Sequence, residues 1–363
     1  MLPVRIGVIG CGAIAQVHHL PNLATLKDLF ELTIVCDLSP SQAEYAAQKF
    51  NVQEHVTDYR QVLNAKNVDA VILCHTDPKT EVAVEAFNAK KHVFIEKPMC
   101  FSLQEADAII AAANNSGTVG QVAYVKVYDP AFEKAKLEVN TMDDIRFVQV
   151  NHLHTDNDLH LRQFNLKRFD DFPLEAIKHC QKTRRAAIQE AIGINVPNHV
   201  SRAFGTLSGS MIHDLYGLRI MLGQPVRIIS TEIWLDGRGI STILEYSSGA
   251  RCIATWVDLP KLWDFKETLE VYGSTKRVLL SYPTGFARGI LSTLTIQEID
   301  ATGTASSRKP AIDWENPFSR ELYYFHESIK KDLPNRTPIT EARNDIALII
   351  KIIKSYQSRE PIS

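Results

Sequence analysis

The sequence predicts an α/β protein in two parts: a doubly wound parallel sheet, then an α+β domain with an open, mostly antiparallel sheet. Up to about residue 122, apolar runs alternate with helical stretches, which is typical of βαβ crossovers. A glycine-rich turn follows the first apolar run, as in sheets that bind a ligand at their carboxyl edge. After about residue 123, consecutive strand-like runs joined by short turns indicate an antiparallel meander. We therefore expect domains at 1–122 and 123–363.

In the first part, the apolar runs are short and rich in β-branched residues. Residues 69–74 are apolar throughout, as a strand buried on both faces should be. Pro21 is expected to kink or end the first helix early. The expected strands are 4–9, 31–36, 69–74, 91–95 and 119–125, and the expected helices lie near 13–27, 40–49, 79–89 and 103–116.

The second part mixes helices with strands. Residues 300–310 are polar and are expected to form an exposed loop. The expected strands are 146–153, 226–235, 240–246, 250–257, 267–272, 276–281 and 293–298, and the expected helices are 173–192, 211–222, 318–331 and 341–357.

Helices on one face of such a sheet leave its other face uncovered. Residues 250–257 alternate without a strongly charged set on either side. A face of this kind is commonly buried between subunits. We therefore expect a homo-oligomer.

Charge and composition narrow the classes of function. The formal net charge of −2 gives no electrostatic reason to expect nucleic acid or an anionic membrane as a partner. No apolar run approaches the length that spans a bilayer, and the N-terminal run lacks the features of a signal peptide. The six cysteines contain no Cys-x-x-Cys pair, so a reducing, cytoplasmic location is expected, with neither disulfides nor a zinc cluster.

The first apolar run leads into Gly10-Cys11-Gly12-Ala13-Ile14-Ala15. Gly10 permits a tight turn, Gly12 lets the backbone approach phosphates, and Ala15 lets the helix lie close to the strand. The N–H groups at the helix start attract an anion. The turn therefore predicts a dinucleotide site that includes Ala13 and Ile14.

Asp37 ends the second expected strand, 25 positions after Gly12. A carboxylate there can accept hydrogen bonds from the adenosine ribose and would repel a 2′-phosphate, so NAD is favoured over NADP. A second interpretation is that Asp37 starts a turn and caps the helix from Ser41. Both roles are compatible.

The fifth strand runs into Glu96-Lys97-Pro98. Ligands of an open parallel sheet bind beyond the carboxyl ends of its strands, so Lys97 is expected at the site. Its ammonium could stabilise negative charge on a substrate oxygen. Taken alone, Lys97 would more readily be interpreted as an exposed lysine that opens a helix turn.

Together, the glycine turn, His18 or His19, Asp37 and Glu-Lys-Pro resemble the glucose–fructose oxidoreductase/inositol dehydrogenase/MocA (Gfo/Idh/MocA) family. The resemblance extends over nearly the whole chain. It implies an NAD(P)-dependent oxidoreductase that acts on a sugar, inositol or related polyol. It also implies cofactor contacts from Glu96, Lys97 and Thr76, and a homodimer or homotetramer joined through the open sheet.

The family's second signature, Asp-x-x-x-His on a helix that ends near Leu-Gly, is matched in part. His213 stands ten residues before Gly223, where the family has its catalytic histidine, but position 209 is Gly rather than Asp. Asp214 should point about 100° away from His213 on a helix and so substitutes poorly for that aspartate. His213 therefore needs another partner or acts less strongly as a base.

The resemblance implies that Lys97 and His213 are catalytic. His213 would take the hydroxyl proton of a secondary alcohol while hydride passes to the nicotinamide, and Lys97 would polarise the same oxygen. Lys126 and His154 are expected substrate contacts. His152, His154, Asp156 and His160 also suggest a metal, but their spacing matches no known site and we expect none.

Two alternatives stay open from sequence. One is a non-catalytic NAD(P)-sensing protein on the same fold, which the missing aspartate favours. The other keeps the enzyme class and replaces the sugar with a non-sugar carbonyl or imine.

Overall fold

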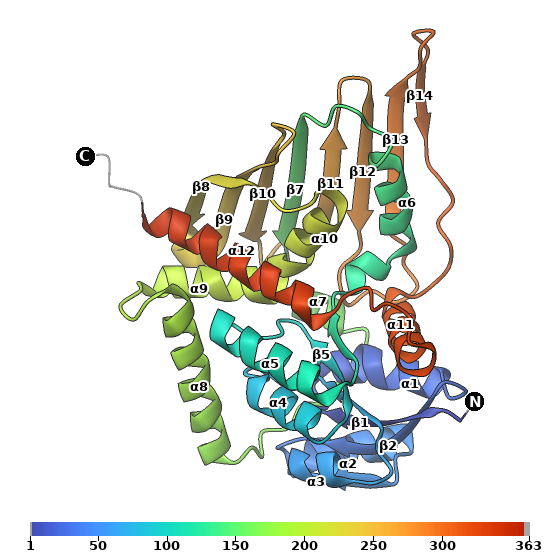
Figure 1. Ribbon diagram of the computed structural model, residues 1–363, viewed down its shortest axis with the longest axis vertical. Coiled ribbons are helices and arrows are strands. Elements are labelled where there is room, and N and C mark those ends of the chain that lie inside the picture. The colour runs from blue at the N-terminus through green and yellow to red at the C-terminus, as the bar shows by residue number, and fades with distance from the viewer. Residues whose placement is uncertain (1, 359–363) are drawn as a thin grey trace. The chain divides into compact units, whose positions relative to one another are not determined.

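The computed structural model describes residues 2–358, which form two compact units. Unit 1 contains residues 2–124, Phe164–Ile194 and Phe318–Ala347. Unit 2 contains Val125–Gln163, Asn195–Pro317 and residues 348–358. Figure 1 gives the element labels used below.

Unit 1 is built on a six-stranded parallel sheet. Its strand order, β3-β2-β1-β4-β5-β6, is that of the doubly wound dinucleotide-binding fold. The order in which strands are added to the sheet reverses between the parallel neighbours β1 and β4. Such folds bind ligands at this point. Its strands are β1 (Val4–Ile9), β2 (Phe30–Cys36), β3 (Glu54–Val56), β4 (Ala70–Leu73), β5 (His92–Glu96) and β6 (Gly120–Ala123).

Four α-helices of the first 124 residues lie where the sequence pattern predicts them, whereas the helix at Tyr59–Asn64 was not predicted. Pro21 does not break the first one, because it lies in the first turn of α1 after a π-helical turn, η1 (Ala15–His19). Figure 1 shows α4 and α5 side by side. The α-helices are α1 (Leu20–Thr25), α2 (Pro40–Phe50), α3 (Tyr59–Asn64), α4 (Thr80–Asn88) and α5 (Leu103–Ser116).

Two segments beyond residue 122 also belong to unit 1, although the sequence places them in the second domain. α8 (Leu174–Ile192) is one of them. The other includes most of α11 (Pro317–Lys331), whose Leu322 and Phe325 are buried in the same apolar cluster as Val4 and Phe30. This packing removes apolar surface from water and explains why the chain returns to unit 1. α12 (Ile339–Gln357) begins in unit 1 and ends in unit 2.

Unit 2 is built on an eight-stranded sheet in the order β14-β13-β12-β11-β7-β10-β9-β8. All neighbours are antiparallel except β7 and β10, which confirms a mostly antiparallel sheet. The strands are β7 (Phe147–His154), β8 (Arg227–Trp234), β9 (Gly239–Glu245), β10 (Arg251–Asp258), β11 (Lys266–Tyr272), β12 (Lys276–Tyr282), β13 (Thr293–Ile299) and β14 (Ala305–Arg308).

Helices pack on one face of this sheet, as Figure 1 shows for α6 and α10. On β10, Cys252, Ala254 and Trp256 are buried, while the alternate residues are half-buried. The alternation agrees with the pattern read from residues 250–257. The helices of unit 2 are α6 (Pro130–Val139), α7 (Asn157–Leu161), α9 (Asn198–Thr206) and α10 (Ile212–Leu222), with the short helices η2 (Val125–Tyr128), η3 (Leu207–Met211) and η4 (Leu235–Gly237).

One expectation for this unit was wrong. Residues 300–310 are not all loop, because β14 pairs Ala305 with Ile299 at the sheet edge. All four β14 side chains are exposed, so the strand has no apolar alternation in its sequence.

Candidate functional site

The glycine turn of unit 1 lies at the carboxyl ends of β1 and β4. Gly10 has a φ of +97°, and a Cβ there would lie 2.2 Å from the backbone nitrogen of His75. Only glycine fits this close approach. A Cβ on Gly12 would meet no atom within 4 Å, so space is open beside the turn. The turn thus has the tight backbone and the free side that a pyrophosphate requires.

Asp37 lies against this turn. Its Oδ2 accepts a hydrogen bond from the Cys11 backbone N–H at 2.8 Å, and its Oδ1 accepts one from the Ser39 N–H at 3.0 Å. Burial raises the pKa of Asp37, although the two N–H donors oppose that effect. The cap of α2 is the Ser39 side chain, which accepts from Gln42 N–H, so the alternative role of Asp37 as the helix cap is not what the structure has.

The loop after β4 adds unsatisfied polar groups to the same edge. Both ring nitrogens of His75 are buried and have no hydrogen-bond partner among residues 2–358. Burial lowers the pKa of His75 to about 4, so the ring is neutral at pH 7. Thr76, the next residue, is exposed. An orphaned imidazole beside an open glycine turn fits the polar edge of a nucleotide, and these residues could hold one.

Glu96 and Lys97 follow β5 at the same edge of the sheet. Glu96 is buried and accepts a hydrogen bond at 2.6 Å from His19 Nε2, and its other oxygen accepts the Lys97 backbone N–H at 3.1 Å. Burial would raise the pKa of Glu96, but the His19 hydrogen bond and the charges of Lys97 and Lys79 together outweigh it and lower the pKa. The His19 pair therefore keeps a carboxylate beside Lys97.

The Lys97 side chain is half-buried, and burial lowers its pKa. A lysine in such surroundings is a stronger hydrogen-bond donor to an oxyanion than one in bulk water. The Lys97–Pro98 peptide bond is cis. The structure therefore brings together, within unit 1, the predicted Gly10–Ala15 turn, Asp37, Thr76, Glu96 and Lys97.

In unit 2, His213 and Asp214 lie in the first turn of α10. Gly209 belongs to η3, a π-helical turn between α9 and α10, and such turns are frequent at functional sites. His213 is half-buried and Asp214 is fully buried. The two adjacent side chains do not form a pair, because Asp214 turns to a different histidine.

That histidine is His152 on β7, whose Nδ1 lies 2.9 Å from Asp214 Oδ2. The Glu267 carboxylate of β11 lies 3.6 Å from the same Nδ1. The Lys126 ammonium pairs with Glu267 and lies 4.0 Å from the second oxygen of Asp214. Burial would raise the pKa of Asp214, but Lys126 and His152 outweigh it and lower the pKa. Asp214 is therefore a carboxylate that orients His152.

The other ring nitrogen of His152 faces two polar groups. His152 Nε2 lies 3.4 Å from His154 Nδ1 and 3.4 Å from Ser210 Oγ. Trp256 Nε1 donates to Ser210 Oγ at 3.0 Å, and its ring stacks on His154 with centroids 5.3 Å apart. Of the predicted substrate contacts, His154 thus lies against His152, and Lys126 lies against the carboxylates beside it. His152 can pass a proton to or from its Nε2 side.

The possible metal set read from sequence does not assemble. His160 packs against the Phe265 ring, and Asp156 caps α7 through its side chain. The His152, Asp214 and Glu267 cluster has ligand-type atoms close together, as has the His19, Glu96 and Glu321 cluster. In the first cluster the Lys126 ammonium already balances the carboxylates.

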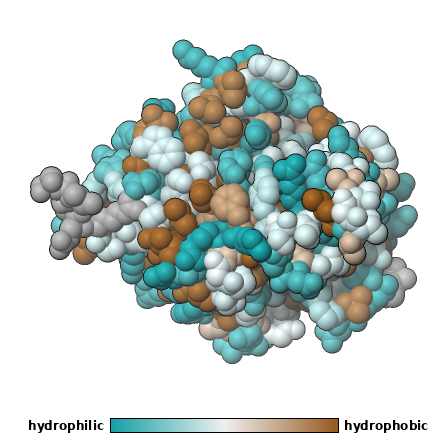
Figure 2. Space-filling model, turned by 90° about the horizontal axis from the view of Figure 1, so that it is seen from above, coloured by the Kyte–Doolittle hydropathy of each residue, from teal (hydrophilic) through white to brown (hydrophobic). Residues whose placement is uncertain are grey.

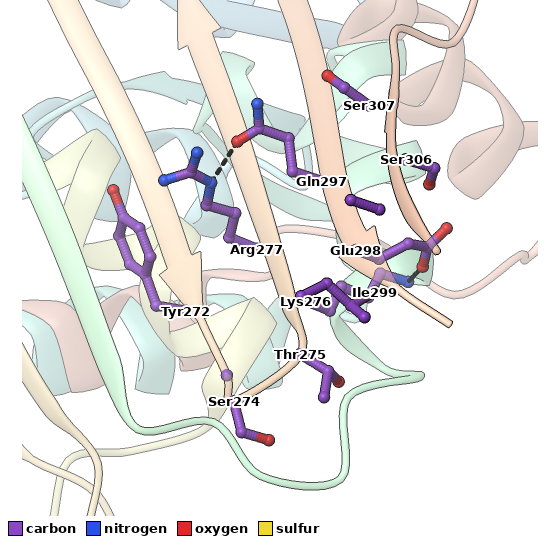
Figure 3. Close-up of a pocket in the computed structure, with 12 residues that line it drawn as sticks. Tyr272, Ser274, Thr275, Lys276, Arg277, Gln297, Glu298, Ile299, Ser306 and Ser307 are labelled. Carbon is purple, nitrogen blue, oxygen red and sulfur yellow. Dashed lines mark hydrogen bonds and ion pairs between the residues drawn. The ribbon is translucent and has the colours of Figure 1, made fainter. Parts of the chain in front are cut away.

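Unit 2 also has a groove at the edge of its sheet, separate from the residues around His152. Figure 3 shows it between β11, β12, β13 and β14, with Arg277 hydrogen-bonded to Gln297. Its lysine, Lys276, is paired with Glu138 at 2.5 Å. The groove contains no predicted site residue. On the face in Figure 2, brown hydrophobic groups are interrupted by hydrophilic ones.

Comparison with known proteins gives a family match within unit 1 and structural matches over both units. The sequence model of the oxidoreductase family with an NAD-binding Rossmann fold, Gfo/Idh/MocA, matches residues 4–124. Residues 4–124, about a third of this chain, match the Gfo/Idh/MocA family. The sequence resemblance is thereby confirmed for the segment that carries the glycine turn, Asp37 and Lys97.

Two relatives of known sequence each match over a third of this chain. The uncharacterized oxidoreductase YrbE of Bacillus subtilis is 32% identical over 131 residues, 36% of this chain and 38% of that protein. Inositol 2-dehydrogenase of Salmonella typhimurium is 30% identical over 138 residues, 37% of this chain and 41% of that protein. The chain thus spans about two fifths of the length of these relatives.

Solved structures extend the likeness to the whole fold. Levoglucosan dehydrogenase in complex with NADH and levoglucosan has a TM-score of 0.75 at 16% identity, over 98% of this chain and 97% of that one. The 3-ketoreductase KijD10 of Actinomadura kijaniata, with NADP and TDP-benzene, has a TM-score of 0.73 at 18% identity, over 98% of each chain. At such identities the likeness shows the fold alone, which confirms the predicted fold class for both units.

Three site features were missed from sequence. The sequence suggests His152 only as a metal ligand and Asp214 only as a poor partner of His213, and no pattern in it marks Glu267. The histidine spacing on one strand was the available signal, since residues i and i+2 share a face. The pairing with Asp214 depends on how α10 lies over β7.

Proposed function

We propose that this chain is an NAD-dependent oxidoreductase that moves a hydride between nicotinamide and a secondary alcohol or ketone of a sugar, inositol or related polyol. The observation that carries the proposal is Lys97 at the carboxyl edge of the sheet that also bears the open glycine turn and Asp37. The matched relatives named as inositol dehydrogenases support the substrate class.

The cofactor would be held by unit 1. Gly10, Gly12 and the start of the following helix would face the pyrophosphate, Asp37 the adenosine ribose, and Thr76 and Glu96 the nicotinamide half. When bound, NAD supplies the hydride acceptor at its nicotinamide ring. NADP is disfavoured because Asp37 would meet its 2′-phosphate.

Lys97 would donate a hydrogen bond to the reacting oxygen, and His213 would accept the hydroxyl proton. Lys126 and His154 would contact the substrate. A second candidate for the proton acceptor is His152, which the Asp214 hydrogen bond at 2.9 Å favours. An orienting carboxylate fixes the tautomer of an imidazole and raises its basicity.

The test is a panel of inositols, sugars and other polyols with NAD, followed by absorbance of NADH. Wild-type protein should reduce NAD with at least one polyol. Lys97→Ala, His213→Ala and His152→Gln are measured beside Lys66→Ala and His55→Ala, whose side chains are exposed. The proposal requires Lys97→Ala and one histidine variant to lose about 10²-fold or more in kcat/KM, with the controls unchanged.

Two results would contradict this assignment. Turnover at near-native rates by Lys97→Ala would remove the role of Lys97. Tight NAD binding by a folded protein that oxidises no polyol with NAD and reduces no ketone, keto acid or imine with NADH would favour the sensing alternative. The relatives reported above are named as oxidoreductases, which supports the enzyme.

We further propose that the protein is a cytoplasmic homodimer or homotetramer joined through the open face of the unit 2 sheet. The outward side chains of β10 and its neighbours include Ile253, Val257, Phe147 and Leu153, which favour burial. No helix of residues 2–358 has the length and apolarity to span a bilayer. Light scattering of Ile253→Arg against wild type tests the interface, and an unchanged mass would contradict it.

A further inference from the structure

Residues 164–171 of unit 1, here called the 164–171 strap, are tied to the glycine turn. Gln16 Nε2 donates to the Lys167 carbonyl at 2.9 Å, and the Lys167 N–H donates to Gln16 Oε1 at 3.1 Å. The same Gln16 Nε2 also donates to the Cys11 carbonyl at 2.9 Å. One glutamine therefore joins the strap to the turn that would face the pyrophosphate.

The strap also reaches the start of α2. The ring of Phe169 packs against that of Tyr45, with centroids 6.0 Å apart. Ser39 Oγ donates to Asp171 Oδ1, and the Ser41 N–H donates to Asp171 Oδ2 at 3.0 Å. These donors lower the pKa of Asp171 to about 2, so it is ionised at pH 7. The strap thus places a fixed negative charge at a helix N-terminus, which favours it.

Two carboxylates converge on Ser39. Asp37 accepts the Ser39 backbone N–H at 3.0 Å, and Asp171 accepts its hydroxyl. In a doubly wound fold the carboxylate at the end of β2 holds the ribose hydroxyls, and a 2′-phosphate would lie beside it. The N–H groups at the start of α2 are the donors that such a phosphate would use. Asp171 already accepts one of them, the Ser41 N–H.

We propose that Asp171 is a specificity-determining residue, which excludes NADP by holding the α2 N-terminus with its own carboxylate. The proposal rests on the proposed function, because it requires a dinucleotide at the glycine turn. Asp171 would thus be a second residue, besides Asp37, that selects NAD over NADP, and it lies more than 130 positions away in the sequence. Lys167 and Arg168 of the strap are cations that could hold a 2′-phosphate, but the group bound to Ser39 and Ser41 is Asp171.

The experiment measures dissociation constants of NADH and NADPH for the full-length chain by fluorescence titration. Asp171→Asn removes the charge and keeps a hydrogen-bond acceptor of the same size. Asp170→Asn is the matched control, since it removes the neighbouring charge. Titration with ADP and 2′,5′-ADP repeats the comparison on the adenosine half alone. Thermal unfolding checks that each variant is folded.

Wild type should bind NADH more tightly than NADPH. Asp171→Asn should raise the affinity for NADPH and 2′,5′-ADP about tenfold, the effect of removing one close like charge, and leave NADH within twofold. Asp170→Asn should resemble wild type. An unchanged NADPH/NADH ratio in Asp171→Asn, or tighter binding of NADPH by wild type, would overturn the proposal while leaving dinucleotide binding intact. Folded wild type that binds neither nucleotide would overturn the proposed function as well.

Discussion

His152 Nδ1 and Asp214 Oδ2 are 2.9 Å apart, although the residues are 62 positions apart in the sequence. Asp214 is fully buried, and its partners Lys126 and His152 lower its pKa. The arrangement is that of a carboxylate that orients an imidazole, and the family motif would instead place that carboxylate at position 209. In this chain the carboxylate is next to His213 in sequence but serves His152.

Asp214→Asn should therefore lower activity strongly. The amide cannot stabilise a protonated His152 and would favour the wrong tautomer, so kcat/KM should fall about 10²-fold or more on a substrate that the polyol panel identifies. In NMR titration, the pKa of His152 should fall in the variant. Asp143→Asn, which changes an exposed carboxylate of the same unit, is the control and should behave as wild type. An unchanged His152 titration and full activity in Asp214→Asn would refute the orienting role.

The two glycines of the turn should respond differently to the same substitution. Gly10→Ala places a Cβ 2.2 Å from the His75 backbone at a φ of +97° and should lower the free energy of unfolding by about 2 kcal/mol or more. Gly12→Ala meets no protein atom within 4 Å, so its stability should match wild type. Its added methyl would lie where a pyrophosphate approaches, so NADH affinity should fall about tenfold or more.

Denaturant unfolding and NADH titration of both variants check this pair. A Gly12→Ala variant that is as unstable as Gly10→Ala, or that binds NADH as tightly as wild type does, would contradict this prediction.

The buried carboxyl of Glu321 should make the free energy of unfolding depend on pH. It is fully buried, and neither of its side-chain oxygens has a hydrogen-bond partner among the described residues. Burial, with repulsion from Glu96, raises its pKa well above the ordinary value, so the folded state holds the proton more tightly than the unfolded state. The stability that Glu321 contributes is fully present below the pKa that its carboxyl has in the unfolded state. It is lost as pH rises toward the pKa of the folded state, by up to about 1.4 kcal/mol per pH unit.

Glu321→Gln keeps a neutral group at every pH and should escape this loss. The variant should gain stability relative to wild type as pH rises from 5 to 8, measured by urea unfolding. Glu44→Gln, at an exposed position of α2, should track wild type throughout. Parallel pH profiles for Glu321→Gln and wild type would show that Glu321 is ionised in the folded state.

Much of the fold could be predicted because its strands are buried on at least one face. β1, β4 and β5 are apolar runs, and β9 to β13 alternate with period two, so both sheets follow from the sequence. β3 and β14 could not be predicted, because they are short edge strands with exposed side chains. The return of α11 to unit 1 depends on which apolar faces meet, and no local pattern encodes that.

Some residues of the candidate site could likewise be predicted from the sequence, and others could not. Gly10, Gly12, Asp37 and Lys97 were predictable, because their positions follow from the ends of parallel strands in a known order. The pairings of Asp214 with His152 and of Asp171 with Ser39 join distant segments through side chains. They depend on the π-helical turn before α10 and on the course of the 164–171 strap, which have no signature in the sequence.

The most direct test of the central claim is a transfer experiment with a polyol deuterated at the reacting carbon. Wild-type protein, NAD and the deuterated substrate are incubated together, and the nicotinamide ring is examined by NMR. The account predicts deuterium on the reduced nicotinamide, with transfer reduced about 10²-fold or more in Lys97→Ala. Reduced nicotinamide without deuterium, or equal transfer by Lys97→Ala, would contradict hydride transfer assisted by this lysine.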